Sequence, residues 1–234
     1  MLAWQSLAPK GDLRLNHWMC GRFALTLPHD AVAGWFDATL RAEFDEPRFN
    51  ICPSQNIVVA VQYMGENILT PMRWGFIPHW YKAPNDGPML INARGETVAQ
   101  KPAFSDAIAK RRCIIPASGF YEWHRADGDK VPWYFHPSDD ELMGFAGIWQ
   151  AWTAPGGARQ VSCAMLTVAA GPQMADVHHR EPVVVEKTRQ MDWLNGDLNL
   201  ITQAPDGFYA KHRVSKDVNK ASAQGAQLIE PLVD

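Results

Sequence analysis

Polar residues interrupt apolar stretches of this sequence at three places, in LINARGET, GFYEWH and VHHREP. The residues concerned are Asn92, Arg94, Glu122, His178, His179 and Arg180. A carboxylate inside the aromatic run GFYEW is costly to bury unless it is paired or protonated. Glu122 is therefore a candidate general acid or base with a raised pKa.

Each of these groups also has an interpretation without chemistry. Strand alternation could point Glu122 outward to water while its neighbours face the core. Either histidine could be a structural residue with satisfied hydrogen bonds. Asn92 could satisfy backbone groups at the end of a strand, and Arg94 could be half of an ordinary ion pair. The residue types alone leave both interpretations open.

The pair Met19–Cys20 is a second feature of chemical interest. Removal of an initiator methionine from such a pair would leave an N-terminal cysteine, yet residues 1–18 precede it here. This leading stretch lacks the charged start and the unbroken apolar run of a secretory signal, and no apolar run in the chain is long enough to span a bilayer. We therefore expect a cytoplasmic protein without membrane contact.

The cysteines predict packing rather than metal binding. Cys20, Cys52, Cys113 and Cys163 are far apart, and no C-x-x-C pair is present. Without a secretory context, we expect four reduced thiols, most of them buried. No metal or cofactor is expected.

The elements that must position these residues are mostly strands. The 234 residues, 47% hydrophobic and 20% charged, are enough for one substantial core, and we expect one domain. Short β-like runs broken by Gly, Pro and Asp fill residues 113–185, and the pattern of residues 56–76 predicts an antiparallel hairpin. Helices are expected after Pro28 with Asp30 as the cap, over 102–110 and over 187–195. The predicted fold class is α+β, with a mainly antiparallel, curved or barrel-like sheet and flanking helices.

Several motifs in series resemble the SRAP family, the SOS response-associated peptidase proteins. The motifs are MCGRF, FNICPSQ, MRWGFIPHW, LINARGET, CIIPASGFYEW, VHHREP and VSKDVN. They occur in the order and spacing of that family, from Met19 to about Pro231. The resemblance implies an SRAP-like fold, with residues 1–18 as an extension and 19–234 as a single SRAP domain. A monomer is expected.

The resemblance also implies a function, which is a covalent shield for abasic sites in single-stranded DNA as part of the SOS and DNA damage response. In the family, an N-terminal cysteine reacts with the ring-opened deoxyribose aldehyde, and the matching position is Cys20. The other active-site positions of the family fall on Asn92, Glu122 and His178. His179 matches no family role.

The chemistry accounts for these residue types. A free α-amine has a pKa of about 7.7 to 8, so part of it is neutral and can attack an aldehyde to form an imine. The thiol of the same cysteine can then close a thiazolidine ring. Glu122 could move protons while the sugar ring opens and water leaves, His178 could donate to the sugar oxygen or the 3′ phosphate, and Asn92 could orient the amine or thiol.

The net charge of −3 argues against strong nonspecific binding of nucleic acid, so DNA would need a local cationic track. The arginines beside the matched motifs are candidates for it, namely Arg22, Arg94, Arg112 and Arg180. Trp74 and Trp80 could stack on unpaired bases. Core packing is the alternative for both tryptophans.

The sequence departs from the family pattern at two points. Cys52 occupies a position that is commonly alanine, where it would add a buried thiol. More important, an internal Cys20 has an amide nitrogen, and imine chemistry cannot begin there. Translation could start at Met19, or the protein could cleave its own Met19–Cys20 bond as a self-processing cysteine peptidase, with crosslinking or lyase-like chemistry to follow. The alternative is a noncatalytic single-stranded DNA binding module.

Overall fold

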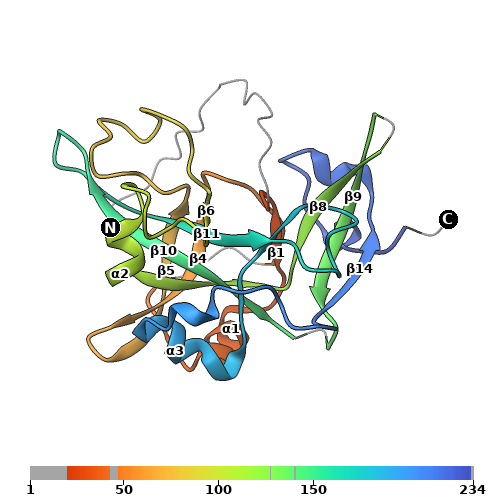
Figure 1. Cartoon of the computed structure of the whole chain (residues 1–234), viewed down its shortest axis with the longest axis horizontal. Coiled ribbons are helices and arrows are strands. Elements are labelled where there is room, and N and C mark those ends of the chain that lie inside the picture. Colours follow the sequence, from red (N-terminus) through yellow and green to blue (C-terminus); the bar gives the residue numbers. More distant parts are fainter. Residues whose placement is uncertain (1–19, 43–46, 127, 140, 233–234) are drawn as a thin grey trace.

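The computed structural model describes residues 20–42, 47–126, 128–139 and 141–232, so the predicted extension over 1–18 lies outside the described residues. Strands make up most of the regular secondary structure in these ranges (Figure 1). The strands are β1 (Phe23–Leu25), β2 (Thr39–Leu40), β3 (Arg48–Ile51), β4 (Asn56–Tyr63), β5 (Glu66–Trp74), β6 (Asn92–Arg94), β7 (Arg112–Ala117), β8 (Gly119–Ala126), β9 (Asp129–Pro137), β10 (Met143–Thr153), β11 (Arg159–Ala169), β12 (Arg180–Pro182), β13 (Val184–Val185) and β14 (Tyr209–Arg213).

The larger sheet closes on itself as a barrel. Its strands pair in the order β11–β10–β7–β4–β5, all antiparallel, and β5 then pairs in parallel with β11 through Ser162 and Cys163. These five strands therefore form a closed ring. Strands β12 and β6 also pair with β11, and β2 pairs with β5. The predicted mainly antiparallel, barrel-like core is confirmed.

A second sheet lies beside the barrel, with the strand order β14–β9–β8–β1–β3. Figure 1 shows β8, β9 and β14 side by side at one end of the molecule, with the barrel strands toward the other end. The chain passes from β7 of the barrel to β8 of the second sheet with only Ser118 between them. This close connection places the motif GFYEW directly beside the barrel.

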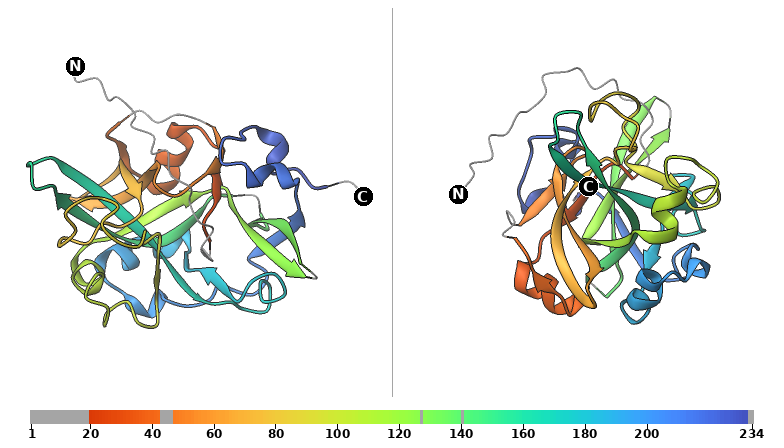
Figure 2. Two further views of the ribbon diagram at one scale, coloured as in Figure 1. Left: turned by 90° about the horizontal axis from the view of Figure 1, so that it is seen from above. Right: turned by 90° about the vertical axis from the view of Figure 1, so that its left-hand side faces the viewer.

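The helices are short and flank the barrel (Figure 2). They are α1 (His29–Phe36), α2 (Ser105–Lys110) and α3 (Gln190–Asn195), and the 3₁₀ turns are Lys187–Arg189, Leu198–Leu200, Lys216–Asn219 and Ala226–Leu228. Helices fall within all three predicted segments. The expected cap is wrong, because the N-cap of the first helix is Pro28, and Asp30 lies in the first turn.

The predicted hairpin over 56–76 is confirmed as β4 and β5, and its turn is tight. Pairing extends to Tyr63 and Glu66, so only Met64 and Gly65 form the turn. Both have positive φ angles, 51° and 83°, as a two-residue hairpin turn with the twist of the strands requires.

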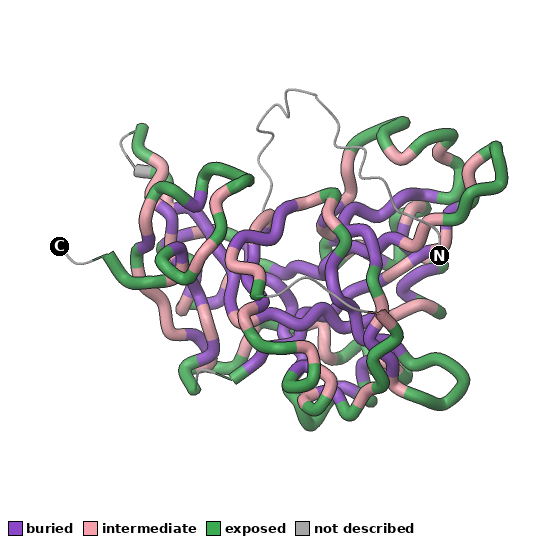
Figure 3. The backbone as a smooth tube through the Cα atoms, turned by 180° about the vertical axis from the view of Figure 1, so that it is seen from behind, coloured by how far each residue is buried: buried purple, intermediate pink, exposed green. Residues whose placement is uncertain are grey.

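The core runs through the barrel and continues under the second sheet, where buried backbone occupies the centre of the molecule (Figure 3). All four cysteines are free, as the sequence predicted, and all of them are buried, where most were expected to be. No helix in the described ranges is long and apolar enough to cross a membrane. Among the same residues, no cluster of three or more His, Cys, Asp or Glu side chains could hold a metal ion.

Candidate active site

Cys20 and Glu122 meet because β1 and β8 are antiparallel neighbours. Phe23 pairs with Phe120, so the residues before β1 lie alongside those that follow Phe120 in β8. The backbone N–H of Cys20 donates a hydrogen bond to Oε1 of Glu122. Both residues are 2% exposed. The tertiary structure therefore joins a cysteine and a glutamate that are 102 positions apart in the chain.

The burial of this pair sets its electrostatics. Burial raises the pKa of the Glu122 carboxyl, while His178 and the bond from Cys20 oppose that shift. Burial also raises the pKa of the Cys20 thiol well above its ordinary value, and the carboxyls of Glu122 and Glu181 add to the increase. The alternative that points Glu122 to water is wrong. A buried carboxyl beside a protonated thiol can accept and return protons, which is what acid–base catalysis requires.

Cys20 also has an unusual backbone conformation. Its φ is 44°, in the left-handed region that residues with a Cβ seldom adopt. This conformation accompanies the hydrogen bond that its N–H donates to Glu122. The nitrogen of Cys20, the atom on which the predicted chemistry depends, therefore points at the candidate acid–base group.

His178 lies at the end of a turn that leads into β12. Its backbone N–H donates to the carbonyl of Met174, and its Nδ1 lies 3.1 Å from both the backbone nitrogen and the carbonyl oxygen of Arg180. These contacts fix the orientation of the ring. The ring lies 4.4 Å from that of His179, whose pKa is lowered by burial and by the nearby positive charges. The charge of His178 acts on Glu122, so this histidine belongs to the same electrostatic site.

Asn92 and Arg94 lie on β6, which pairs in parallel with β11. Asn92 pairs with Met165 and is partly buried, whereas Arg94 pairs with Thr167 and is exposed. The two candidates are two positions apart on one strand, so they share a face of the sheet and differ only in how far they are covered. Arg94 retains the exposure that a phosphate contact needs.

Arg180 is 8% exposed, and its charge is compensated within the fold. It forms a two-pronged ion pair with Glu96, at 2.5 and 2.8 Å, and donates to the carbonyl of Thr167 at 2.6 Å. The pair holds the pKa of Glu96 at about 2. Arg180 therefore fixes β12 to β11 and to the segment after β6.

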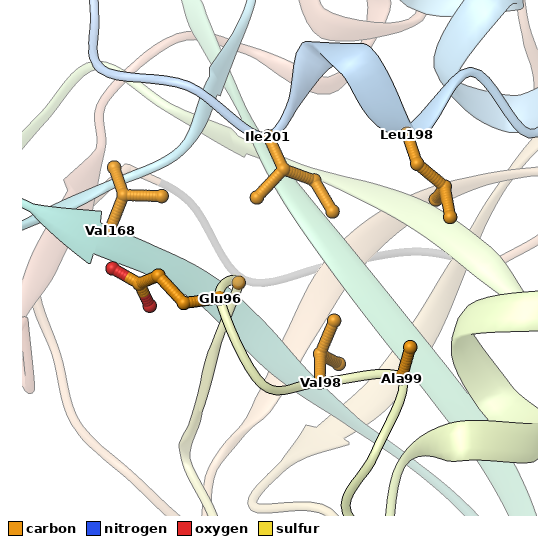
Figure 4. Close-up of a pocket in the computed structure, with 7 residues that line it drawn as sticks. Glu96, Val98, Ala99, Val168, Leu198 and Ile201 are labelled. Atoms are coloured by element: carbon orange, nitrogen blue, oxygen red, sulfur yellow. The ribbon is translucent and has the colours of Figure 1, made fainter.

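Glu96 also borders a pocket of about 290 Å³ (Figure 4). The other lining residues are small or apolar, namely Gly95, Val98, Ala99, Val168, Leu198 and Ile201. The only side-chain carboxylate of the lining is already paired with Arg180. This pocket contains none of the predicted catalytic residues.

Two predicted DNA contacts are corrected by the structure. Trp74 is fully buried, with its indole N–H donating to the carbonyl of Ile91, so it offers no face to a base. Arg112 donates to carbonyl oxygens at the ends of α2 and α3. The hydrogen bonds of Arg112 thus hold α2 and α3 in place. Neither Trp74 nor Arg112 is kept as a candidate for DNA binding.

Arg22 forms hydrogen bonds within the protein, whereas Trp80 is largely exposed. Arg22 donates to Oδ1 of Asn50 at 2.8 Å and to the carbonyl of Val218 at 2.5 Å, so it anchors the C-terminal segment to β3. Trp80 is 49% exposed and packs edge-on against His79 at 4.9 Å. Stacking of Trp80 on a base stays a prediction.

Sequence reasoning missed two buried groups. Glu181 is 1% exposed and accepts from the backbone N–H groups of Gly171 and Ala204. A glutamate next to an arginine is typical of a surface ion pair, so its sequence context gave no signal. Asn50 is fully buried and donates to three carbonyls of the C-terminal segment, those of Val218, Lys220 and Ala223. The motif FN in FNICPSQ could have pointed to it.

A strand-rich barrel with a second sheet, and a buried cysteine–glutamate pair at strands β1 and β8 of that second sheet, define the class of this protein. Residues 19–221 match the model of the SOS response associated peptidase family, abbreviated SRAP. The chain belongs to this family.

Relatives and solved structures agree with this assignment. The chain is 38% identical over 222 residues to "Abasic site processing protein YoqW" of Bacillus subtilis, covering 91% of this chain and 99% of the relative. It is 26% identical over 227 residues to "Abasic site processing protein YedK" of Escherichia coli, covering 92% and 100%. A crystal structure of a Bacteroides thetaiotaomicron protein aligns with a TM-score of 0.84 at 19% identity, over 92% of this chain and all of that one, and shows the same fold.

Proposed function

We propose that this protein processes abasic sites in single-stranded DNA by forming a covalent bond to the lesion through Cys20. The observation that carries the proposal is the hydrogen bond from the nitrogen of Cys20 to the buried carboxyl of Glu122. The names of the relatives, which are abasic site processing proteins, support the choice of substrate.

The proposed reaction begins once Cys20 is the first residue. Its neutral amine attacks the C1′ aldehyde of the ring-opened sugar, and loss of water gives an imine. The thiol then adds across the C=N bond, so that sulfur bonds to C1′ and the thiol proton passes to nitrogen. Glu122 would take a proton from the attacking amine and return one to the departing water, because its raised pKa suits both steps.

The remaining groups would support this step. His178 would donate to the sugar oxygen or the 3′ phosphate, Asn92 would orient the amine or thiol, and the exposed Arg94 would contact phosphate. Arg180 and Arg22 already form hydrogen bonds within the protein, to Glu96 and Asn50. We therefore propose that they support the DNA-binding surface chiefly by fixing the segments around it.

The first experiment compares protein that begins at Met1 with protein that begins at Cys20, each incubated with single-stranded DNA carrying one abasic site. A denaturing gel detects the covalent product. We expect a heat-stable shifted band from the form with Cys20 exposed. Absence of a band from that form, together with retained DNA binding, would instead support the noncatalytic binding module.

The form that begins at Met1 tests self-processing. If it crosslinks, an intact-mass measurement decides between cleavage of the Met19–Cys20 bond and reaction through another group. Loss of residues 1–19 in the mass, abolished in Cys20→Ala, would establish self-cleavage. An unchanged mass would assign the crosslink to a side chain.

Variants of the Cys20-first form test the residue roles. Glu122→Gln keeps the shape of the side chain but cannot exchange a proton, so we expect crosslinking to slow roughly 100-fold, within the usual range for general acid–base catalysis. Cys20→Ser should abolish the thiazolidine, and Cys52→Ala, which removes a buried thiol held in the fold, should crosslink normally. An unchanged rate in Glu122→Gln would remove Glu122 from the mechanism.

A further inference from the structure

Trp133 is the side chain that faces Glu122 across the second sheet. In the antiparallel pairing of β8 and β9, Glu122 is directly opposite Trp133. Residues directly opposite share a face of the sheet, with Cβ atoms roughly 4.5 to 5.5 Å apart. The neighbouring pair in the same register, Phe120 and Phe135, has stacked rings 5.2 Å apart, as this arrangement requires. An indole therefore lies next to the buried carboxyl of the candidate site.

Burial decreases along this face toward Trp133. Phe120 and Phe135 are 1% and 0% exposed, and Glu122 is 2% exposed. Trp133 packs against the same core but is only partly buried. The two phenylalanines therefore lie in the core, and Trp133 lies where this face of the sheet becomes accessible to solvent.

A lysine from the adjacent strand fixes the position of this indole. The Nζ of Lys211 lies 5.7 Å from the centre of the Trp133 ring. The same Nζ donates to the carbonyl of Gln173 at 3.0 Å and to both oxygens of Asp176, at 2.5 and 2.7 Å. Asp176 is two residues before His178. The indole and the turn that carries His178 are therefore held by one lysine.

We infer that Trp133 is a stacking platform for the nucleobase that flanks the abasic sugar. This inference rests on the proposed function and specifies how the lesion would be positioned in the site. An abasic sugar carries no base, so the base beside it lacks a stacking partner on that side. A preorganised aromatic ring at the rim of the site supplies one, whatever the identity of the base. The apolar ring fits a base rather than a phosphate.

The test measures equilibrium binding to single strands that contain tetrahydrofuran, an abasic analogue without an aldehyde, so no crosslink can form. Three strands are compared, one with both flanking bases, one without the 5′ base and one without the 3′ base. On the first strand, Trp133→Ala should bind roughly 5- to 150-fold more weakly than the unchanged protein, the range of base–aromatic stacking. On one of the other two strands, that difference should disappear.

Matched variants separate stacking from a structural effect. Trp133→Tyr should restore most of the affinity, because it keeps an aromatic face. Trp35→Ala is the control, since Trp35 is also partly buried and also has a lysine over its ring, Lys187 at 5.8 Å, but lies on α1. It should bind all three strands as the unchanged protein does.

Two results would overturn the inference. One is an equal loss of affinity on all three strands in Trp133→Ala, and the other is no loss on any strand. The proposed function fails differently, when the unchanged protein with Cys20 exposed binds these strands but forms no crosslink with a strand that bears the aldehyde.

Discussion

At the scale of single residues, the pH dependence of stability should report the burial of Glu122. Its pKa is raised in the folded protein, so the folded state holds this proton to higher pH than the unfolded state. Stability is therefore unaffected at pH values below the ordinary pKa and falls as pH rises through the raised one. Glu122→Gln removes the cost of burying a charged carboxylate at high pH, because glutamine does not ionise. We expect the variant to gain free energy of unfolding relative to the unchanged protein as pH rises from 4 to 8.

Urea unfolding at a series of pH values measures this difference. Glu186→Gln provides the control, because Glu186 is exposed and its substitution should leave the pH dependence unchanged. A constant difference between Glu122→Gln and the unchanged protein across the whole pH range would contradict the prediction.

At the scale of elements, Arg112 and Arg94 should separate stability from DNA binding. The guanidinium of Arg112 donates to carbonyls of Ile108 and Ala109 at the end of α2, and of Trp193 and Leu194 at the end of α3. Hydrogen bonds from a charged donor contribute about 1.5 to 3 kcal/mol. Arg112→Ala should lower the free energy of unfolding by about 2 kcal/mol and leave DNA affinity unchanged in the folded protein.

Arg94→Ala should show the opposite behaviour. Arg94 is exposed on β6, so its loss should change the free energy of unfolding by less than about 0.5 kcal/mol. If it contacts a phosphate, the slope of log K against log salt should become shallower by roughly 0.7. Denaturant unfolding and salt titration of the two variants measure both quantities. Equal DNA affinity in Arg94→Ala and the unchanged protein would exclude the phosphate contact.

At the scale of the whole molecule, salt should weaken DNA binding only moderately. The net charge is −3, and several arginines are engaged in the fold. If roughly three phosphates are neutralised, affinity for a single strand should fall roughly 20-fold between about 50 and 200 mM salt. Fluorescence anisotropy with a tetrahydrofuran strand measures this. A salt-independent affinity would argue against a cationic track.

The sequence predicted the elements better than the side-chain roles. The barrel, the hairpin and the helical segments follow from apolar periodicity and turn residues, which are local signals. Trp74 and Trp80 belong to one short motif, yet Trp74 is fully buried and Trp80 is 49% exposed. Local pattern cannot separate them, because exposure depends on which distant strands pack over each ring.

The sequence by itself determined the family, through motifs in series, and the burial-prone setting of Glu122 among aromatic residues. Only the tertiary structure decided which groups meet. The pairing of β1 with β8 brings the nitrogen of Cys20 to Glu122, and the register of β8 with β9 sets Trp133 beside the same carboxyl. Strand pairing joins residues far apart in the chain, and a shift of one residue would turn each side chain to the other face of the sheet.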